Sequence, residues 1–268
     1  MSLKFEKLPT LKLDSNEIHL WLTVPDEIQQ PKLLTAYDQL LTEEERAQQQ
    51  RFRFAKHRHQ YLVTRALVRT TLSRYINLEP HLWRFSKNAY GRPEISIPTG
   101  LPPLRFNLSH TEGLIICGVV LTQDIGVDVE NIERQGATVE IAERFFSTQE
   151  VNDLHLVSEL NRQDRFFDYW TLKESYIKAR GMGLSLPLEQ FTFHISEDQP
   201  LRISFAPQLH DNPEQWQFWL LKPTPCHTVA ISVRRKNHTD NYQLVIKKVI
   251  PLMREEAFFC QSYKDQVP

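Results

Sequence analysis

The order of helical and extended segments repeats along this chain, and the repeat restricts the possible folds more than any other feature. Each part of the chain reads as amphipathic helices followed by short strands. The apolar runs LIICGVVL (114–121) and HTVAISV (227–233) occupy matching places, and their β-branched content indicates buried strands. The repeat predicts an α+β fold of two similar halves, with a ligand cleft between them.

The same pattern predicts the boundaries of these halves. Residues 1–122 would form the N-terminal α+β half, 123–240 the C-terminal α+β half, and 241–268 a tail with one apolar stretch that is a candidate docked strand. We expect helices over 41–54, 59–76, 139–154 and 165–181, and strands over 17–24, 83–86, 105–109, 114–121, 123–132, 190–196, 217–222 and 227–233.

Composition excludes several classes of function. With a formal net charge of −1 over 268 residues, the chain lacks the basic excess typical of nucleic-acid binding. No apolar run approaches the roughly 20 residues of a membrane-spanning helix. The three cysteines lie far apart in no zinc-binding spacing, and no signal peptide is visible. We therefore expect a cytoplasmic protein with no nucleic-acid or membrane partner.

Two carboxylates alternate with apolar residues in the segment QDIGVDVENI. On a strand, Ile125, Val127 and Val129 point to one face, while Asp128 and Glu130 point to the other. Carboxylates held this close repel each other, and a Mg²⁺ ion shared with substrate phosphates would remove the repulsion. The alternative interpretation is a strand end with two solvated acids.

A second charged motif, WTLKESYIKARG, lies on a predicted helix. Its spacing puts Trp170, Lys173, Glu174, Ile177 and Lys178 on adjoining positions of one side. The glutamate could add a third carboxylate to a metal site, and the lysine one turn later could meet a phosphate oxygen. The alternative is a surface ion pair, which contributes only ~0.3–0.5 kcal/mol.

Two turns carry further candidate anion ligands. In RFNLSHTEG, Ser109 and His110 end a predicted strand, where a hydroxyl, an imidazole and loop N–H groups suit a phosphate. In KNAYGRPEI, Lys87 and Arg92 flank a tight turn and could reach an adenine or a phosphate. Plain turns are the alternative for both, and no G-x-S-x-G elbow makes Ser109 a nucleophile.

Basic side chains also gather on and between the first two long helices. Arginine forks suit bidentate phosphate binding, although a solvated helix face accounts for most such clusters. The cluster comprises Arg46, Arg51, Arg53, Lys56, Arg58, Arg65 and Arg69.

The order of these motifs resembles the Sfp-type 4′-phosphopantetheinyl transferase superfamily. GRPEI, FNLSH, GVDVE, RFFS…E and WTLKESYIKARGMGLSLPL follow one another between about residues 41 and 196, with weaker likeness to about residue 233. The paired signatures (V/I)G(V/I)D and WxxKExxxK are specific to that superfamily. The resemblance implies a monomer of two pseudo-twofold-related halves, each with helices packed on a small antiparallel sheet. Coenzyme A would lie in the cleft between them.

The resemblance also implies an activity. The enzyme would transfer 4′-phosphopantetheine from coenzyme A to a serine of an apo acyl or peptidyl carrier protein, releasing 3′,5′-ADP, as a holo-carrier-protein synthase does. The carrier could serve fatty-acid, polyketide or nonribosomal peptide synthesis. Two rival interpretations are a different Mg²⁺-dependent phosphotransferase and a coenzyme A-binding module without activity.

By the same resemblance, Asp128, Glu130 and Glu174 match the acids that bind Mg²⁺, with Mn²⁺ a second candidate ion. Lys178 matches the lysine that holds a coenzyme A phosphate. The general base would be Glu174 or, second, Glu150, which falls where many relatives carry a glutamate near the metal.

The resemblance assigns the coenzyme contacts too. Ser109 and His110 match coenzyme ligands, with His110 near the 3′-phosphate and a contributor of positive charge to catalysis. The KNAYGR loop matches the adenine-side segment, with Arg92 in place of the family's lysine. Basic positions that some relatives use are Glu45 and Gln48 here. The candidate basic ligands of the nucleotide are therefore Lys87, Arg92, Arg46, Arg53 and Arg65.

Overall fold

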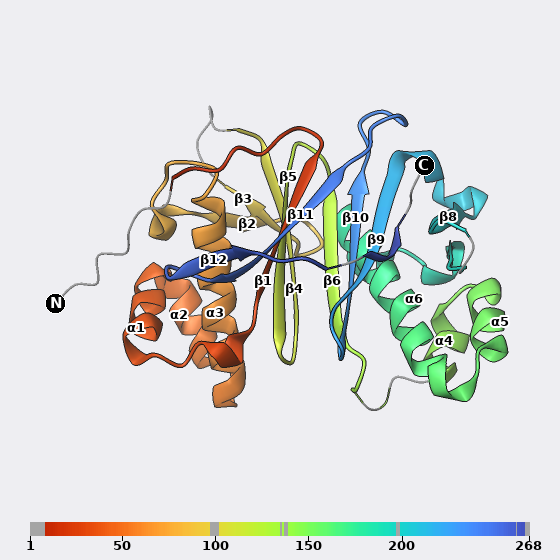
Figure 1. Ribbon diagram of the computed structural model, residues 1–268, viewed down its shortest axis with the longest axis horizontal. Helices are drawn as coiled ribbons and strands as arrows, with labels where there is room; N and C mark the ends of the chain where they lie inside the picture. The colour runs from red at the N-terminus through yellow and green to blue at the C-terminus, as the bar shows by residue number, and fades with distance from the viewer. Residues whose placement is uncertain are drawn as a thin grey trace.

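The computed structural model describes residues 9–96, 102–134, 136, 139–196, 199–260 and 262–265 (Figure 1). The helices are α1 (Pro31–Leu40), α2 (Glu43–Gln50), α3 (Ala55–Leu72), α4 (Val139–Phe145), α5 (Thr148–Leu156) and α6 (Glu159–Arg180). The strands are β1 (Glu17–Thr23), β2 (Phe85–Lys87), β3 (Pro93–Ile95), β4 (Leu104–Thr111), β5 (Leu114–Leu121), β6 (Ile125–Asn131), β7 (Phe191–His194), β8 (Arg202–Phe205), β9 (Trp216–Thr224), β10 (His227–Arg234), β11 (Gln243–Ile250), β12 (Arg254–Ala257) and β13 (Ser262–Asp265). Short 3₁₀ helices include η3 (Gly183–Ser185) and η4 (Leu188–Gln190).

The fold is α+β, and its two main sheets pack against each other between outer layers of helices. The five-stranded sheet has the order β12-β11-β1-β5-β4, and the four-stranded sheet has the order β13-β9-β10-β6. Apolar residues of α1 and α3 pack on the first sheet, and those of α4–α6 pack on the second. A third cluster joins the sheets and includes Leu20, Ile116, Val127 and Ile231. Figure 1 shows α1–α3 at one end of the molecule and α4–α6 at the other.

Strand β6 has the alternation that its sequence predicts. Ile125, Val127 and Val129 are buried in the cluster that joins the two sheets. The residues between them face α6 instead. A Cβ atom on Gly126 would lie 1.9 Å from the carbonyl oxygen of Ser175, so only glycine allows β6 and α6 to approach this closely.

The edge strands β4 and β6 bring the two sheets together. The side-chain oxygen of Asn107 in β4 accepts a hydrogen bond from the backbone N–H of Val127 in β6, at 3.0 Å. Next to this contact, a Cβ atom on Gly118 of β5 would lie 2.7 Å from a methyl group of Val127. The C-terminal end of β4 therefore lies beside β6.

Helix ends follow local capping signals. Thr42 and Glu45 form the predicted capping box of α2, since each side chain accepts from the other's backbone N–H. The single helix predicted over 139–154 is wrong, because a second capping box at Ser147 ends α4 and starts α5. Helix α6 ends as predicted at Gly181, which has a φ of 64°.

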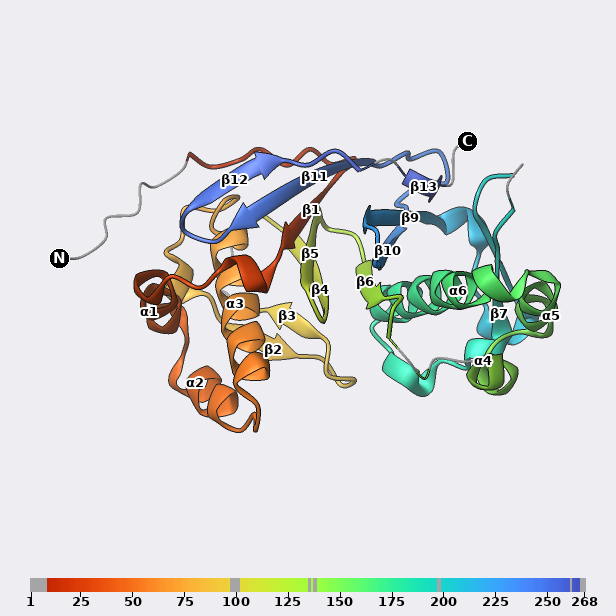
Figure 2. The same cartoon turned by 60° about the horizontal axis from the view of Figure 1, so that its bottom comes forward.

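The segment predicted as a tail extends both sheets. β11 lies between β1 and β12 and runs parallel to β1, with Glu17 opposite Gln243. β13 pairs with β9, while residues 261 and 266–268 lie outside the described part. Figure 2 shows β11 and β12 crossing the N-terminal half and β13 beside β9. The expectation of a purely antiparallel sheet is thus wrong for the N-terminal half, because a strand from the far end of the chain completes it.

Among the helices and strands of the described residues, those not predicted are α1, β3, β8, β12 and β13. The sequence of α1 did carry a signal, since Leu33 and Tyr37 are spaced one turn apart and are both buried. β3 and β8 are short edge segments with little pattern of their own. In the ranges described above, no helix is both long and apolar enough to cross a membrane.

Candidate active site

A buried carboxylate at the junction of β4, β6 and α6 forms the centre of the site. Asp128 is 4% exposed, and its Oδ1 atom accepts hydrogen bonds from Lys178 Nζ at 2.6 Å and from Ser109 Oγ at 2.8 Å. Lys178 also donates to Ser109 Oγ at 2.9 Å. Three residues predicted from separate motifs are thus brought into mutual contact.

The second oxygen of the same carboxylate has no partner. Asp128 Oδ2 is buried and makes no hydrogen bond with any described residue. An unsatisfied buried carboxylate oxygen costs about 1–3 kcal/mol or more, so it marks a position where a cation or a donor would bind favourably.

The charge of Asp128 affects the pKa of two nearby carboxylates. Burial, and then the charge of Asp128, raise the pKa of Glu130 to about 7. Trp170 Nε1 donates to Glu130 Oε1 at 3.1 Å. Burial and the same charge also raise the pKa of Glu174, against the opposing effect of Lys178. The three acids therefore concentrate negative charge that the protein compensates only in part.

These residues fit a hard divalent cation. Among the described residues, no set of three or more His, Cys, Asp or Glu side chains is gathered closely enough to hold a metal ion by itself. Mg²⁺ is usually bound by one or two carboxylates, with substrate phosphates and water as its other ligands. The free Oδ2 atom of Asp128 and the nearby Glu130 and Glu174 match that donor set.

His110 lies beside this cluster at the end of β4. The residue is exposed to solvent on part of its surface. Desolvation by the surrounding protein, and then the ammonium of Lys178, lower the pKa of its imidazole, and His57 adds to the effect. A lowered pKa disfavours the charged imidazolium at any given pH.

The KNAYGR loop is the turn between β2 and β3. Lys87 is exposed at the end of β2. Arg92 points instead toward the C-terminal half, where its Nη1 atom donates to the carbonyl oxygen of Ala179 at 2.8 Å. Its Nη2 atom donates to Glu94 Oε1 at 2.9 Å. This arginine, expected as a coenzyme ligand, is occupied by protein groups.

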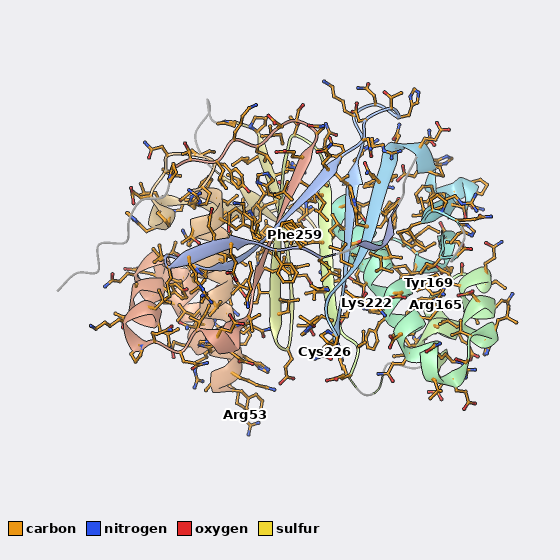
Figure 3. The ribbon with its side chains drawn as sticks, viewed as in Figure 1. Arg53, Arg165, Tyr169, Lys222, Cys226 and Phe259 are labelled. Atoms are coloured by element: carbon orange, nitrogen blue, oxygen red, sulfur yellow. The ribbon has the colours of Figure 1, made fainter. Side chains whose placement is uncertain are left out.

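Most of the N-terminal arginines considered as coenzyme ligands are also bonded to protein groups. Arg65 and Arg69 both donate to the carboxylate of Glu45. Arg46 donates to two carbonyl oxygens at the end of α1, at 2.9 and 2.8 Å. Arg53 is exposed in the connection just before α3, with its guanidinium 5.5 Å from the ring centre of Phe54 (Figure 3). Of the three predicted ligands, only Arg53 presents an open guanidinium.

The structure does not bring Glu150 to the acid cluster. Its carboxylate pairs with Lys173 Nζ at 2.8 Å and accepts from the backbone N–H groups of Ser147 and Phe193, each at 2.9 Å. Lys173 Nζ also donates to the carbonyl oxygens of Leu188 and Phe191, each at 2.7 Å, so the ion pair lies within the C-terminal core.

Two residues that sequence reasoning did not assign to the site contribute to it. Trp170 orients Glu130, and Asn107 holds β4 against β6. The tryptophan was visible on the correct side of the helix, and an asparagine at an inward-facing strand position is itself unusual. The polar partners of both, however, are set by the packing of segments distant in sequence.

Comparison with known proteins agrees with these observations. The family model described as "4'-phosphopantetheinyl transferase superfamily" matches residues 124–242. A second model, "4'-phosphopantetheinyl transferase, N-terminal", matches residues 29–120. A crystal structure of holo-acyl-carrier-protein synthase from Thermotoga maritima is 22% identical over 42% of this chain and 64% of that chain, with a TM-score of 0.35, a likeness too weak to support an argument.

Curated relatives match a larger share of the chain. The 4′-phosphopantetheinyl transferase HetI of Nostoc is 33% identical over 227 residues, or 85% of this chain and 92% of the relative. The transferase Sfp of Bacillus subtilis is 37% identical over 61% of this chain and 70% of its own length. The transferase ffp of the same species is 38% identical over 63% and 72%. The chain therefore belongs to the Sfp-type 4′-phosphopantetheinyl transferase superfamily.

Proposed function

We propose that this chain transfers the 4′-phosphopantetheine group of coenzyme A to a serine of an apo acyl or peptidyl carrier protein. The products are a holo-carrier protein and 3′,5′-ADP. The observation that carries the proposal is the contact of Asp128 with Lys178 and Ser109, next to Glu130 and Glu174, in a member of this superfamily.

We further propose that the two halves are pseudo-twofold copies and that coenzyme A lies in a cleft between them. The order of strands supports this. In one sheet β1, β5 and β4 are antiparallel neighbours, and in the other β6, β10 and β9 are. In each half a first strand, helices and a final hairpin follow in the same sequence.

We assign the coenzyme contacts to cationic and hydroxyl groups that lie beside the acid cluster or are exposed to solvent. Lys178, Ser109 and His110 would meet phosphate oxygens, because they surround the buried carboxylate. Lys87 and Arg53 are exposed and can reach the nucleotide, whereas Arg46 and Arg65 already have partners in the protein.

The reaction needs negative charge to be neutralised at the pyrophosphate. A Mg²⁺ ion held by Asp128, Glu130 and Glu174 would supply Lewis-acid polarisation of the phosphoryl oxygens when bound. Lys178 adds a positive charge beside it, and His110 adds a hydrogen-bond donor or a charge. The P–O bond to 3′,5′-ADP breaks as the carrier serine oxygen bonds to phosphorus, and Glu174, directly or through water, accepts the serine proton.

Glu174 is the better of the two candidate bases. Its carboxylate lies beside the acid cluster, where burial and the charge of Asp128 raise its pKa. Glu150 has all of its described contacts within the C-terminal core. We expect Glu174→Gln to lower kcat by about 100-fold or more while coenzyme A still binds. Near-normal turnover of this variant would contradict the role.

The proposed activity is tested by intact mass. Purified chain is mixed with coenzyme A, Mg²⁺ and several apo-carrier proteins, and a gain of one phosphopantetheine on a carrier is the expected result. EDTA should abolish the gain and added Mg²⁺ should restore it, with Mn²⁺ tested in parallel. The carrier with the fastest reaction then indicates whether fatty-acid, polyketide or peptide synthesis is served.

The other outcomes separate the rival functions. Coenzyme A binding without transfer to any carrier would favour a binding module. No coenzyme A binding, with metal-dependent activity on another substrate, would favour a different phosphotransferase. We also propose a cytoplasmic monomer, in keeping with three cysteines that form no disulfide among the described residues.

A further inference from the structure

The turn between β2 and β3 reaches from the N-terminal half to the end of α6. Figure 2 shows this hairpin pointing toward the C-terminal half. Its internal shape is fixed by Asn88, whose Oδ1 atom accepts from the backbone N–H groups of Tyr90 and Arg92, each at 2.9 Å. The Nδ2 atom of the same side chain donates across to the carbonyl oxygen of Gly181 at 2.8 Å. Asn88 therefore both closes the turn and ties it to α6.

Arg92 makes the second tie. Its Nη1 atom donates to Ala179 O at 2.8 Å and approaches Lys178 O at 3.5 Å. Two carboxylates also pair with the guanidinium, Glu94 at 2.9 Å from Nη2 and Asp124 at 3.6 Å from Nη1, and the side chain is 14% exposed. A Cβ atom on Gly181 would lie 2.7 Å from Arg92 Cζ, so the helix end and the guanidinium are in direct contact.

The chemistry of a helix end explains why this contact is favourable. The last carbonyl oxygens of a helix have no partner within the helix, and they carry the negative end of its dipole. An arginine fork and an amide N–H₂ group satisfy both requirements. The hairpin of one half thus caps the main helix of the other.

The capped turn of α6 contains Lys178. Its backbone is held by Arg92 while its Nζ atom lies 2.6 Å from Asp128 Oδ1. We propose that Arg92 and Asn88 are positioning residues that fix this turn, and so place the Lys178 ammonium at the acid cluster. The proposal rests on the proposed function, and it gives Arg92 a role different from the coenzyme contact expected from its motif.

Steady-state kinetics distinguish the two roles. If Arg92 positions Lys178, Arg92→Ala lowers kcat about tenfold or more with a smaller change in the KM for coenzyme A. The same relative loss should occur with 3′-dephospho-coenzyme A. A raised KM with unchanged kcat, or a loss seen only when the 3′-phosphate is present, would assign Arg92 to the coenzyme and overturn the proposal.

Conservative variants test the geometry. Asn88→Asp keeps the Oδ1 acceptor of the turn but removes the donor to Gly181 O, and it should also lower kcat. Arg92→Lys keeps the positive charge and a donor group that can extend to the helix end. It should recover part of the activity lost in Arg92→Ala. Arg202→Ala, which removes an exposed arginine of β8, is the matched control and should leave kcat unchanged.

Coupling and exchange separate positioning from general stability. Adding Arg92→Ala to Lys178→Ala should reduce kcat by less than about twofold further, since the group being positioned is already gone. Hydrogen exchange at residues 178–181 should be faster in Arg92→Ala and Asn88→Asp, with the first turns of α6 unchanged. Additive losses in kcat, or unchanged exchange at the helix end, would refute the proposal that Arg92 and Asn88 position Lys178. Transfer by the wild-type chain is measured first, so failure of the proposed function is seen separately.

Discussion

At the residue scale, the charged side chains of this protein divide into two groups with different chemistry. Around Asp128 the charges are incompletely compensated, with a buried oxygen left unpartnered and the pKa of Glu130 raised to about 7. Other charges are paired, as in Glu45 with Arg69 and Glu150 with Lys173. Sequence motifs named members of both groups, because a residue type alone does not reveal its partners.

The buried pair gives the first prediction at this scale. Replacing Glu150 with alanine leaves the Lys173 ammonium buried without its counter-charge, so we expect the free energy of unfolding to fall by about 3 kcal/mol or more. Urea unfolding measures the change. Glu143→Ala, at an exposed position of α4, should change stability by less than about 0.5 kcal/mol. A Glu150→Ala chain of unchanged stability but no turnover would instead indicate a chemical role.

The second prediction concerns pH. Burial raises the pKa of Asp168 to about 6, with Lys222 and Arg165 (Figure 3) opposing the shift in part. The stability that a raised folded-state pKa contributes is fully present below the ordinary pKa of 3.8 and is lost as the pH rises through about 6. Asp168→Asn should therefore gain about 1–3 kcal/mol over the wild type between pH 4 and pH 8.

Urea unfolding at several pH values tests this expectation. The difference between variant and wild type should grow as the pH rises and should level off above pH 7. The matched control is Asp164→Asn, a half-exposed residue paired with Lys222 at 3.0 Å, for which no such gain is expected. A pH-independent difference for Asp168→Asn would show that desolvation of its charge is not the cause.

At the element scale, local patterns predicted most of the fold. The face alternation of β6, the bounds of β5, the capping box of α2 and the glycine stop of α6 all follow from a few neighbouring residues. The break between α4 and α5 was missed although Ser147 and Glu150 carried its capping signal. The strand order, and the direction in which Arg92 points, depend on segments distant in sequence, so no local pattern contains them.

The close contact of β6 with α6 leads to a prediction about stability. Gly126→Ala would place a carbon 1.9 Å from a backbone oxygen of α6, so strand and helix must separate. We expect a loss of about 3 kcal/mol or more, or failure to fold, measured by thermal unfolding. Gly136→Ala, where an added carbon meets nothing, should cost only the strain of its positive φ, about 1–2 kcal/mol. Equal losses in the two variants would contradict the argument.

At the scale of the whole molecule, the last strands bind the halves together. β11 and β12 complete the N-terminal sheet, β13 adds to the C-terminal sheet, and Tyr37 Oη donates to Pro251 O at 2.8 Å. A chain ending at residue 240 would lose Val249 and Ile250 from the core around α3. We therefore expect it to be unfolded in its N-terminal half, as judged by circular dichroism and sedimentation.

A shorter truncation is the control for this prediction. A chain ending at residue 260 keeps β11 and β12 and loses only β13, so it should remain folded with a smaller loss of stability. A folded, active chain ending at residue 240 would show that β11 is an accessory strand.

The parallel pairing of β1 with β11 also has a consequence for biosynthesis. Thr23 donates to the carbonyl oxygen of Val249, 226 residues further along, so β1 cannot pair with β11 until β11 has been synthesised. At a translation rate of about 5–20 residues per second, this delay is on the order of ten seconds or more. The C-terminal half emerges from the ribosome before the N-terminal sheet can close. Nascent chains should thus carry an open β1 edge that chaperones can bind until β11 has emerged.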